Sequence, residues 1–171
     1  MSLPVTIIVM GVSGCGKSTI AALLAGHLGW EFRDADDFHP PANIAKMRAS
    51  IPLTDDDRAP WLRAIAGYIE SLRASGGHGV VTCSALKRAY RSVLIGANRD
   101  VTLVFLEGTQ AMISERLSAR FGHFMPPGLL KSQLDTLQPP GDDEAPIKVS
   151  IAATPNAIAD AILKELRARS Q

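Results

Sequence analysis

A short apolar run followed at once by a glycine-rich loop constrains this chain more than any other feature. Residues 5–10 are apolar apart from Thr6, as in a strand buried on both faces of a parallel sheet. They lead directly into GVSGCGKS, residues 11–18, and then into a stretch whose apolar residues follow a helical spacing. The order strand, loop, helix predicts an α/β unit, and the loop fits Gly-x4-Gly-Lys-Ser without a mismatch.

The chemistry of this loop is that of a phosphate cradle. Glycines allow successive backbone N–H groups to turn inward, and the following helix adds the positive end of its dipole. Lys17 is expected to reach the β- and γ-phosphates of ATP, and the Ser18 hydroxyl is expected to be a ligand for Mg²⁺. The residues predicted to bind ATP at this loop are Gly11, Val12, Ser13, Gly14, Cys15, Gly16, Lys17, Ser18 and Thr19.

Length, charge and cysteine content limit the other possibilities. At 171 residues, the chain is expected to form one domain over residues 1–171. A net charge of +1 argues against a nucleic-acid or polybasic membrane role. No apolar run approaches the roughly 20 residues of a membrane span, and no signal peptide is evident at the N-terminus. With only two cysteines, expected to be reduced thiols, the chain is predicted to be cytoplasmic.

Apolar runs typical of strands alternate with helical patterns along the whole chain. Five strands with intervening helices predict a three-layer α/β domain, with a five-stranded parallel sheet and helices on both faces. The four strands expected after the first are residues 31–34, 79–83, 101–106 and 147–151.

A nucleotide-binding loop alone does not define a function. The chain carries neither an Asn-Lys-x-Asp guanine signature nor a Leu-Ser-Gly-Gly-Gln-like transporter signature. A kinase of small molecules additionally needs an acceptor pocket with a base, cations around the transferred phosphoryl group and a lid that excludes water. Candidates for all three are present.

The acceptor pocket is predicted in FRDADDFHPPANIAKM, residues 32–47. Asp34 ends the second strand and Asp36 follows it, at the carboxyl edge of the sheet where open α/β folds bind ligands. Asp36 is the predicted acceptor of a hydroxyl proton. The residues predicted to hold an anionic, hydroxyl-rich substrate next to it are His39, Lys46 and Arg58.

A second substrate edge is predicted after the third strand, in CSALKRAYR. Ser84 directly follows the strand, and Lys87 and Arg91 come after it at helical spacing. No aspartate ends this strand, so water together with Asp34 or Asp36 would have to complete the Mg²⁺ site.

A small mobile lid is predicted at about residues 120–130, where FGHFMPPG breaks the helical pattern. Arg116 and Arg120 are four residues apart on one helix face, so both can point towards one site and bind the nucleotide. Arg120 is predicted to be catalytic, stabilising the charge that develops on the γ-phosphate when the lid closes.

Six stretches in order, most of them described above, resemble the small P-loop gluconokinases, relatives of shikimate and adenylate kinases. The similarity covers about residues 5–151 and is carried most specifically by PLTDDDRAPWL and CSALKRAYR; the other stretches are GVSGCGKS, DADDFHPPANIAKM, RLSARFGHFM and SQLDTLQPP. The resemblance implies ATP-dependent phosphorylation of D-gluconate to 6-phospho-D-gluconate, with a mobile lid and often a homodimer. It also implies that Arg120, Gly122 and His123 belong to the lid, with His123 near the substrate.

Two other readings stay open at this point. One is a kinase of another small hydroxy acid on the same fold, although Cys83 and Ser84 stand where a shikimate kinase would have a glycine-rich turn. The other is a nucleotide-binding module without catalysis, against which the presence of both Asp36 and the lid arginines argues.

Overall fold

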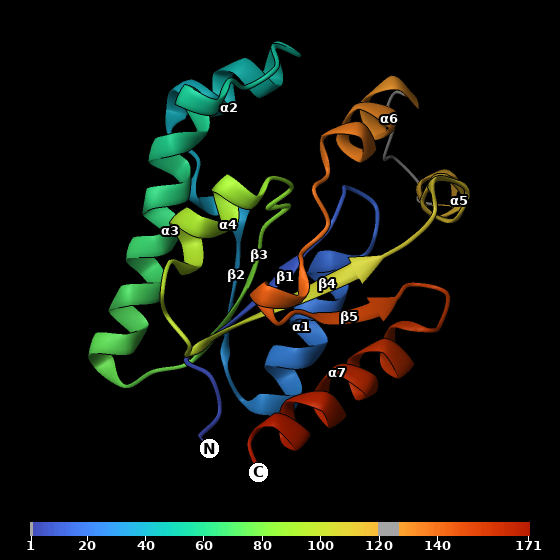
Figure 1. Ribbon diagram of the computed structural model, residues 1–171. Coiled ribbons are helices and arrows are strands. Elements are labelled where there is room, and N and C mark those ends of the chain that lie inside the picture. Colours follow the sequence, from blue (N-terminus) through green and yellow to red (C-terminus); the bar gives the residue numbers. More distant parts are fainter. Residues whose placement is uncertain (1, 120–126) are drawn as a thin grey trace.

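The computed structural model describes residues 2–119 and 127–171, and its centre is a parallel sheet of five strands (Figure 1). The strand order is β2-β3-β1-β4-β5, and every neighbouring pair is parallel. The prediction of a five-stranded parallel sheet is confirmed. The strands are β1 (Thr6–Met10), β2 (Glu31–Asp34), β3 (Gly79–Thr82), β4 (Val101–Glu107) and β5 (Ile147–Ser150).

Helices cover both faces of the sheet, as the three-layer prediction requires. α1 and α7 pack on one face, and α3 and α4 pack on the other (Figure 1). The helices are α1 (Lys17–Leu28), α2 (Pro41–Arg48), α3 (Asp55–Ser75), α4 (Arg88–Ile95), α5 (Gln110–Ser118), α6 (Pro127–Thr136) and α7 (Pro155–Arg169). Two short 3₁₀ helices are η1 (Ala35–Phe38) and η2 (Asp142–Glu144).

The central strand β1 shows why the sheet needs cover on both sides. Its side chains alternate, so Ile7 and Val9 pack with α1 and α7, whereas Ile8 and Met10 pack with α3 and α4. All four are inaccessible to solvent, which explains the unbroken apolar run in the sequence. Because β1 is fixed between both layers, the loop that follows it starts from a rigid position.

The segment expected to form the lid lies mostly outside the described residues. Residues 127–130, at its end, belong to α6. Among the described residues, no helix is both long and apolar enough to cross a membrane.

A buried ion pair fastens α4 to η2. The side chain of Arg91 is 2% exposed and donates from Nε to Glu144 Oε1 at 2.6 Å and from Nη2 to Oε2 at 3.1 Å. Its Nη1 donates to the carbonyl oxygens of Ala85 and Leu86. The guanidinium group is thus bonded to protein oxygens on several sides, and it links two segments that are about 50 residues apart in the chain.

Replacing Arg91 should therefore cost stability. Arg91→Met is expected to lower the free energy of unfolding by about 3 kcal/mol, since Glu144 would lose its main counter-charge. The value is at the low end for a buried pair because the backbone N–H of Gly141 still donates to Glu144. Urea denaturation measures the change. Arg88→Met is the control, because Arg88 is half exposed and should contribute less than about 1 kcal/mol. Equal losses in the two variants would contradict this role for Arg91.

Candidate functional site

The loop between β1 and α1, residues 11–16, has the conformation of a phosphate cradle. Gly14 and Gly16 have φ angles of +87° and +95°, in the left-handed region that favours glycine. Gly14 also lacks room for a side chain, because a Cβ there would lie 2.7 Å from carbons of Leu117. α1 begins directly after the loop, so the positive end of its dipole is directed at the hollow of the cradle.

Lys17 folds back along this loop. Its Nζ donates to the carbonyl oxygens of Gly11 at 2.9 Å and Val12 at 3.1 Å. These contacts hold the ammonium group at the edge of the cradle, where a lysine of this pattern meets nucleotide phosphates.

Ser18 connects the loop to the second strand. Its Oγ donates to Asp34 Oδ2 at 3.0 Å, and Asp34 Oδ1 accepts from the backbone N–H of Asp36 at 2.9 Å. Asp34 thereby caps η1 while it contacts the predicted Mg²⁺ ligand. A hydroxyl and a carboxylate side by side are the hard oxygen donors that Mg²⁺ prefers.

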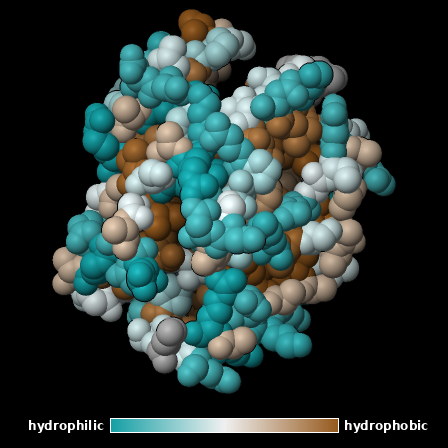
Figure 2. Space-filling model, viewed as in Figure 1, coloured by the Kyte–Doolittle hydropathy of each residue, from teal (hydrophilic) through white to brown (hydrophobic). Residues whose placement is uncertain are grey.

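A cleft of about 470 Å³ extends from the loop to the carboxyl ends of β2 and β3. It opens between the two projecting parts of the molecule that contain α2 and α6, and the surface is visibly indented there (Figure 2). The predicted site residues that line it are Ser13, Gly14, Gly16, Lys17, Ser18, Asp36, His39, Arg58 and Ser84.

Asp36 is the carboxylate best suited to accept a proton here. It lies in η1, directly beyond β2, and is exposed towards the cleft. Reduced hydration in the cleft raises the pKa of Asp36, and the nearby Asp34 raises it further. His39 and Lys17 act in the opposite direction but do not cancel the rise. A raised pKa makes this carboxylate a stronger base.

His39 and Arg58 form the wall opposite the loop. The imidazole of His39 stacks on Trp61, with ring centroids 4.4 Å apart and an angle of 10° between the planes. Arg58 Nη1 donates to the carbonyl oxygen of Leu53 at 2.9 Å and lies 3.4 Å from the Tyr90 hydroxyl. Both side chains are therefore held in defined positions at the cleft.

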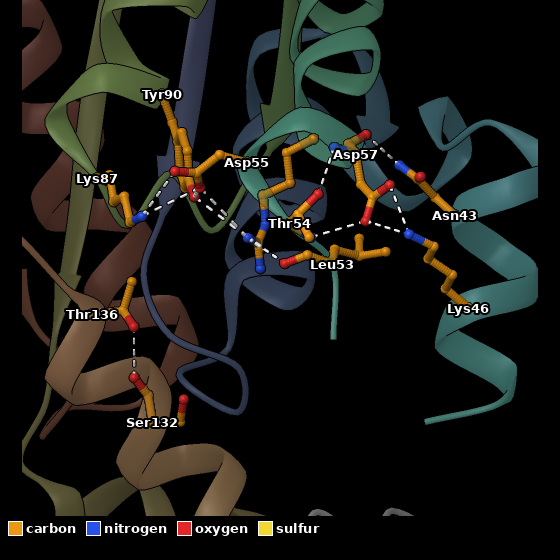
Figure 3. A network of polar contacts seen from close by, with 11 residues as sticks. Asn43, Lys46, Leu53, Thr54, Asp55, Asp57, Lys87, Tyr90, Ser132 and Thr136 are labelled. Carbon is orange, nitrogen blue, oxygen red and sulfur yellow. Dashed lines mark hydrogen bonds and ion pairs between the residues drawn. The ribbon is translucent and has the colours of Figure 1, made fainter. Parts of the chain in front are cut away.

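Three residues predicted to bind substrate do not line the cleft. Lys46 Nζ donates to both carboxylate oxygens of Asp57, at 2.8 and 2.9 Å, and Lys87 Nζ lies 3.2 Å from Asp55 (Figure 3). Arg91 is engaged by Glu144 and lines a larger cavity at the amino ends of β1 and β4, away from the loop. Each of these three cations forms an ion pair with a carboxylate of the protein, so its position favours a structural role.

The remaining predicted residues lie around the loop or outside the described part of the chain. Arg116 and Thr19 border a smaller cavity of about 220 Å³ on the far side of Gly14 and Gly16. Arg116 Nη2 donates to the carbonyl oxygen of Ile151. The predicted lid residues Arg120, Gly122 and His123 lie outside the described residues.

Cys15 differs from what its place beside Lys17 and the helix dipole suggests. Its side chain is fully buried, and burial raises the pKa of the thiol although Lys17 acts in the opposite direction. Cys15 is thus a protonated, buried thiol that fills the base of the loop beside Gly11.

Gln133 is a cleft residue that sequence reasoning missed. Its Oε1 accepts from the backbone N–H of Ser13 at 2.8 Å, and its Nε2 donates to Ser13 Oγ at 3.0 Å. These two bonds join α6 to the phosphate loop across 120 residues of sequence. A single glutamine in a helix gives no spacing signal that would reveal such a contact.

Comparisons with known proteins agree with this geometry. The family model for shikimate kinase matches residues 13–133. A gluconokinase of Gluconobacter oxydans is 46% identical over 166 residues, which cover 96% of this chain and 93% of the relative. A gluconokinase structure from Sinorhizobium meliloti is 43% identical with a TM-score of 0.90, covering 99% of this chain and 95% of that one. A shikimate kinase from Aquifex aeolicus, 19% identical with a TM-score of 0.60, shares the fold.

The parallel sheet, the phosphate loop and these relatives together define a kinase of the P-loop class. The resemblance found in the sequence is confirmed. More narrowly, the chain belongs to the gluconokinase family, since relatives of that name match it over nearly its whole length and theirs.

The contact between Gln133 and Ser13 predicts an effect on nucleotide binding. Gln133→Leu removes both hydrogen bonds while keeping side-chain volume, so the loop loses part of its support. We expect the Kd for an ATP analogue to rise about 3–10-fold, as for the loss of one or two ordinary hydrogen bonds. Titration calorimetry measures it. Gln138→Leu is the control, because Gln138 bonds the backbone of Arg88, outside the cleft lining. An unchanged Kd in Gln133→Leu would refute the idea.

Proposed function

We propose that this protein transfers the γ-phosphoryl group of ATP to the 6-hydroxyl of D-gluconate, forming 6-phospho-D-gluconate. The observation that carries the proposal is one cleft bordered by the phosphate loop at one end and by Asp36, His39 and Arg58 at the other. The family supplies the acceptor, since relatives at 42–46% identity are gluconokinases. The size of the cleft, about 470 Å³, suits a six-carbon acid beside the terminal phosphate.

Substrate ATP would bind with its phosphates in the loop around Lys17. The cavity bordered by Thr19 and Arg116, on the other side of the loop, is the proposed place of the nucleoside. Ser18 and Asp34 are the proposed residues around Mg²⁺, whose chemistry at this place is to neutralise phosphate charge. Arg120 remains the proposed lid cation over the γ-phosphate.

The acceptor would lie against the wall formed by Arg58, His39 and Ser84. The planar guanidinium group of Arg58 suits the carboxylate end, while His39 and Ser84 offer hydrogen bonds to hydroxyl groups. The resemblance to gluconokinases also implies that His123, Lys46, Lys87 and Arg91 bind the substrate. Of these, the positions of Lys46, Lys87 and Arg91 favour support of the cleft over direct contact.

The transfer itself needs little covalent chemistry from the protein. The oxygen of the 6-hydroxyl forms a bond to the γ-phosphorus while the bond from that phosphorus to the β–γ bridging oxygen breaks. Asp36 takes the hydroxyl proton, and ADP leaves with the electron pair of the broken bond. Lys17 stabilises the negative charge on the phosphoryl oxygens.

One assay tests the acceptor. ADP release, coupled to a reporter enzyme, is measured with gluconate, other sugar acids, shikimate and nucleoside monophosphates. We expect gluconate to give the highest kcat/KM and Lys17→Ala to abolish turnover, because the phosphate charge is then uncompensated. A different preferred acid would support the alternative of another hydroxy-acid kinase. No stimulation by any acceptor would favour a nucleotide-binding module.

Asp36 has its own prediction in the pH profile. The proposed base must be ionised, and the pKa of Asp36 lies above its ordinary value, so kcat should fall on the acid side as pH drops through this raised pKa. Asp36→Asn should lower kcat by about 10²–10⁴ and remove this acid limb. Asp37→Asn is the control, because exposed Asp37 does not line the cleft. A near-normal kcat in Asp36→Asn would exclude the role.

We further propose, from the resemblance, that the protein acts as a homodimer in the cytoplasm. Analytical ultracentrifugation of the purified chain tests the assembly, and a monomer at micromolar concentration would contradict it.

A further inference from the structure

The buried amide of Asn43 touches both the substrate wall and the start of α3. Asn43 lies in α2 and is 3% exposed. Its Nδ2 donates to the backbone carbonyl oxygen of Asp57 at 2.8 Å (Figure 3), and the same nitrogen lies 3.3 Å from His39 Nδ1. A buried polar group with two partners of this kind restricts the hydrogen positions that are possible.

The orientation of the amide follows from Asp57. A carbonyl oxygen can only accept, so the amide group must present its nitrogen, and not its oxygen, at this place. The amide nitrogen carries two hydrogens and no acceptor. Its second hydrogen is therefore available to His39 Nδ1, which must accept it and cannot itself carry a proton.

We propose that Asn43 is a positioning residue that fixes His39 as a neutral ring with its proton on Nε2, so that His39 presents an N–H donor to the cleft. With Nδ1 occupied by the amide of Asn43, Nε2 is the ring nitrogen left to meet a ligand. His39 lines the cleft, and the partner of this donor is an oxygen acceptor, a hydroxyl or carboxylate oxygen of the phosphoryl acceptor.

The surroundings hold the ring in this state. Stacking on Trp61 fixes the ring plane, and Trp61 is itself anchored by its Nε1, which donates to the carbonyl oxygen of Ala35 at 2.7 Å. Burial is the main cause that lowers the pKa of His39. Arg58 in α3 lowers it further, and Asp36 in η1 opposes both without reversing them. The neutral ring is thus the prevailing form near neutral pH.

This inference rests on the proposed function where it concerns the acceptor. It adds that His39 donates to the substrate and does not compete with Asp36 for the hydroxyl proton. One ring nitrogen is already an acceptor for Asn43, and the other carries a hydrogen. A substrate whose oxygen accepts from Nε2–H is then favoured over an analogue that lacks this oxygen.

The structure contains an internal reference with the opposite tautomer. His78 Nδ1 lies 2.9 Å from the carbonyl oxygen of Pro4, so in His78 it is Nδ1 that must carry the hydrogen. His78 also stacks on an indole, that of Trp30. The two histidines therefore share a stacked environment and differ in the group that meets Nδ1.

Long-range ¹H–¹⁵N NMR of the histidine rings in the unliganded protein tests the proposal without any substrate. We expect His39 to show an unprotonated Nδ1 and a protonated Nε2, and His78 to show the reverse. His39→Gln identifies the His39 signals by their loss. A protonated Nδ1 in wild-type His39, or a cationic ring at pH 7.5, would overturn the assignment.

Two variants attribute the tautomer to Asn43. In Asn43→Ala the His39 nitrogens should move towards the averaged shifts of exchanging tautomers, while His78 keeps its shifts. In Asn43→Asp the new carboxylate should draw the proton to Nδ1 and raise the pH at which His39 titrates. Unchanged His39 shifts in a folded Asn43→Ala protein would refute the role of Asn43. Unchanged His78 signals report that the Asn43→Ala variant is folded. If the variant does not fold, the wild-type spectrum alone decides the tautomer of His39.

The kinetic consequence is separate. Asn43→Ala should raise KM for the acceptor about 3–10-fold, the cost of one hydrogen bond, with a smaller change in kcat and none in KM for ATP. If the preferred acceptor is not gluconate, the proposed function fails while the NMR result stands. If the tautomer is reversed and gluconate is still phosphorylated, this inference alone fails. An acceptor KM equal to that of wild type would remove Asn43 from substrate recognition.

Discussion

The hydrogen bond from Ser18 to Asp34 joins the two halves of the chemistry in this protein. Ser18 is the second residue of α1, directly behind the phosphate loop, and Asp34 ends β2 on the acceptor side. The same carboxylate caps η1 by accepting from the backbone N–H of Asp36, so it also fixes the backbone position of the proposed base. A change in the position of the loop should therefore shift Asp36, because the side chain of Asp34 contacts both. The parallel sheet makes this possible, because it gathers the carboxyl ends of β1, β2 and β3 at one edge.

The fold and the core of the site could be predicted because both follow from local rules. An apolar run before a Gly-x4-Gly-Lys-Ser loop predicts β1 and the start of α1, and the alternation of elements predicts the sheet. The position of Asp36 follows from its place just beyond β2, since strand ends of a parallel sheet share an edge. Such inferences need only the order of elements and not the path of any side chain.

The substrate cations could not be resolved in this way, because a charge in a sequence does not reveal its partner. Lys46, Lys87 and Arg91 carry the same charge as Arg58, and each of the four has a carboxylate within 4 Å, but of the four only Arg58 lines the cleft. Two of those carboxylates come from the acidic run that starts α3. The run supplies the cap and the helix-dipole charge expected of it, and it also pairs cations that would otherwise be candidates for the cleft.

Neutral residues were harder still to predict, and they explain how the cleft keeps a hydrogen-bond donor separate from the proposed base. Gln133 and Asn43 carry no charge, and the stretches that contain them give no sign of their contacts. The amide of Gln133 bonds the N–H and the hydroxyl of Ser13, and the amide nitrogen of Asn43 meets two acceptors, on His39 and Asp57. Around Asn43, a fixed amide leaves His39 a donor and so leaves Asp36 to accept the proton. A charged residue in place of Asn43 would disturb this division. A carboxylate would favour a protonated Nδ1 on His39, and an ammonium group would be repelled by the positive charge of Arg58. The selectivity of the cleft thus depends on the neutral amide of Asn43. The importance of this amide follows only from the two acceptors that its hydrogens must meet.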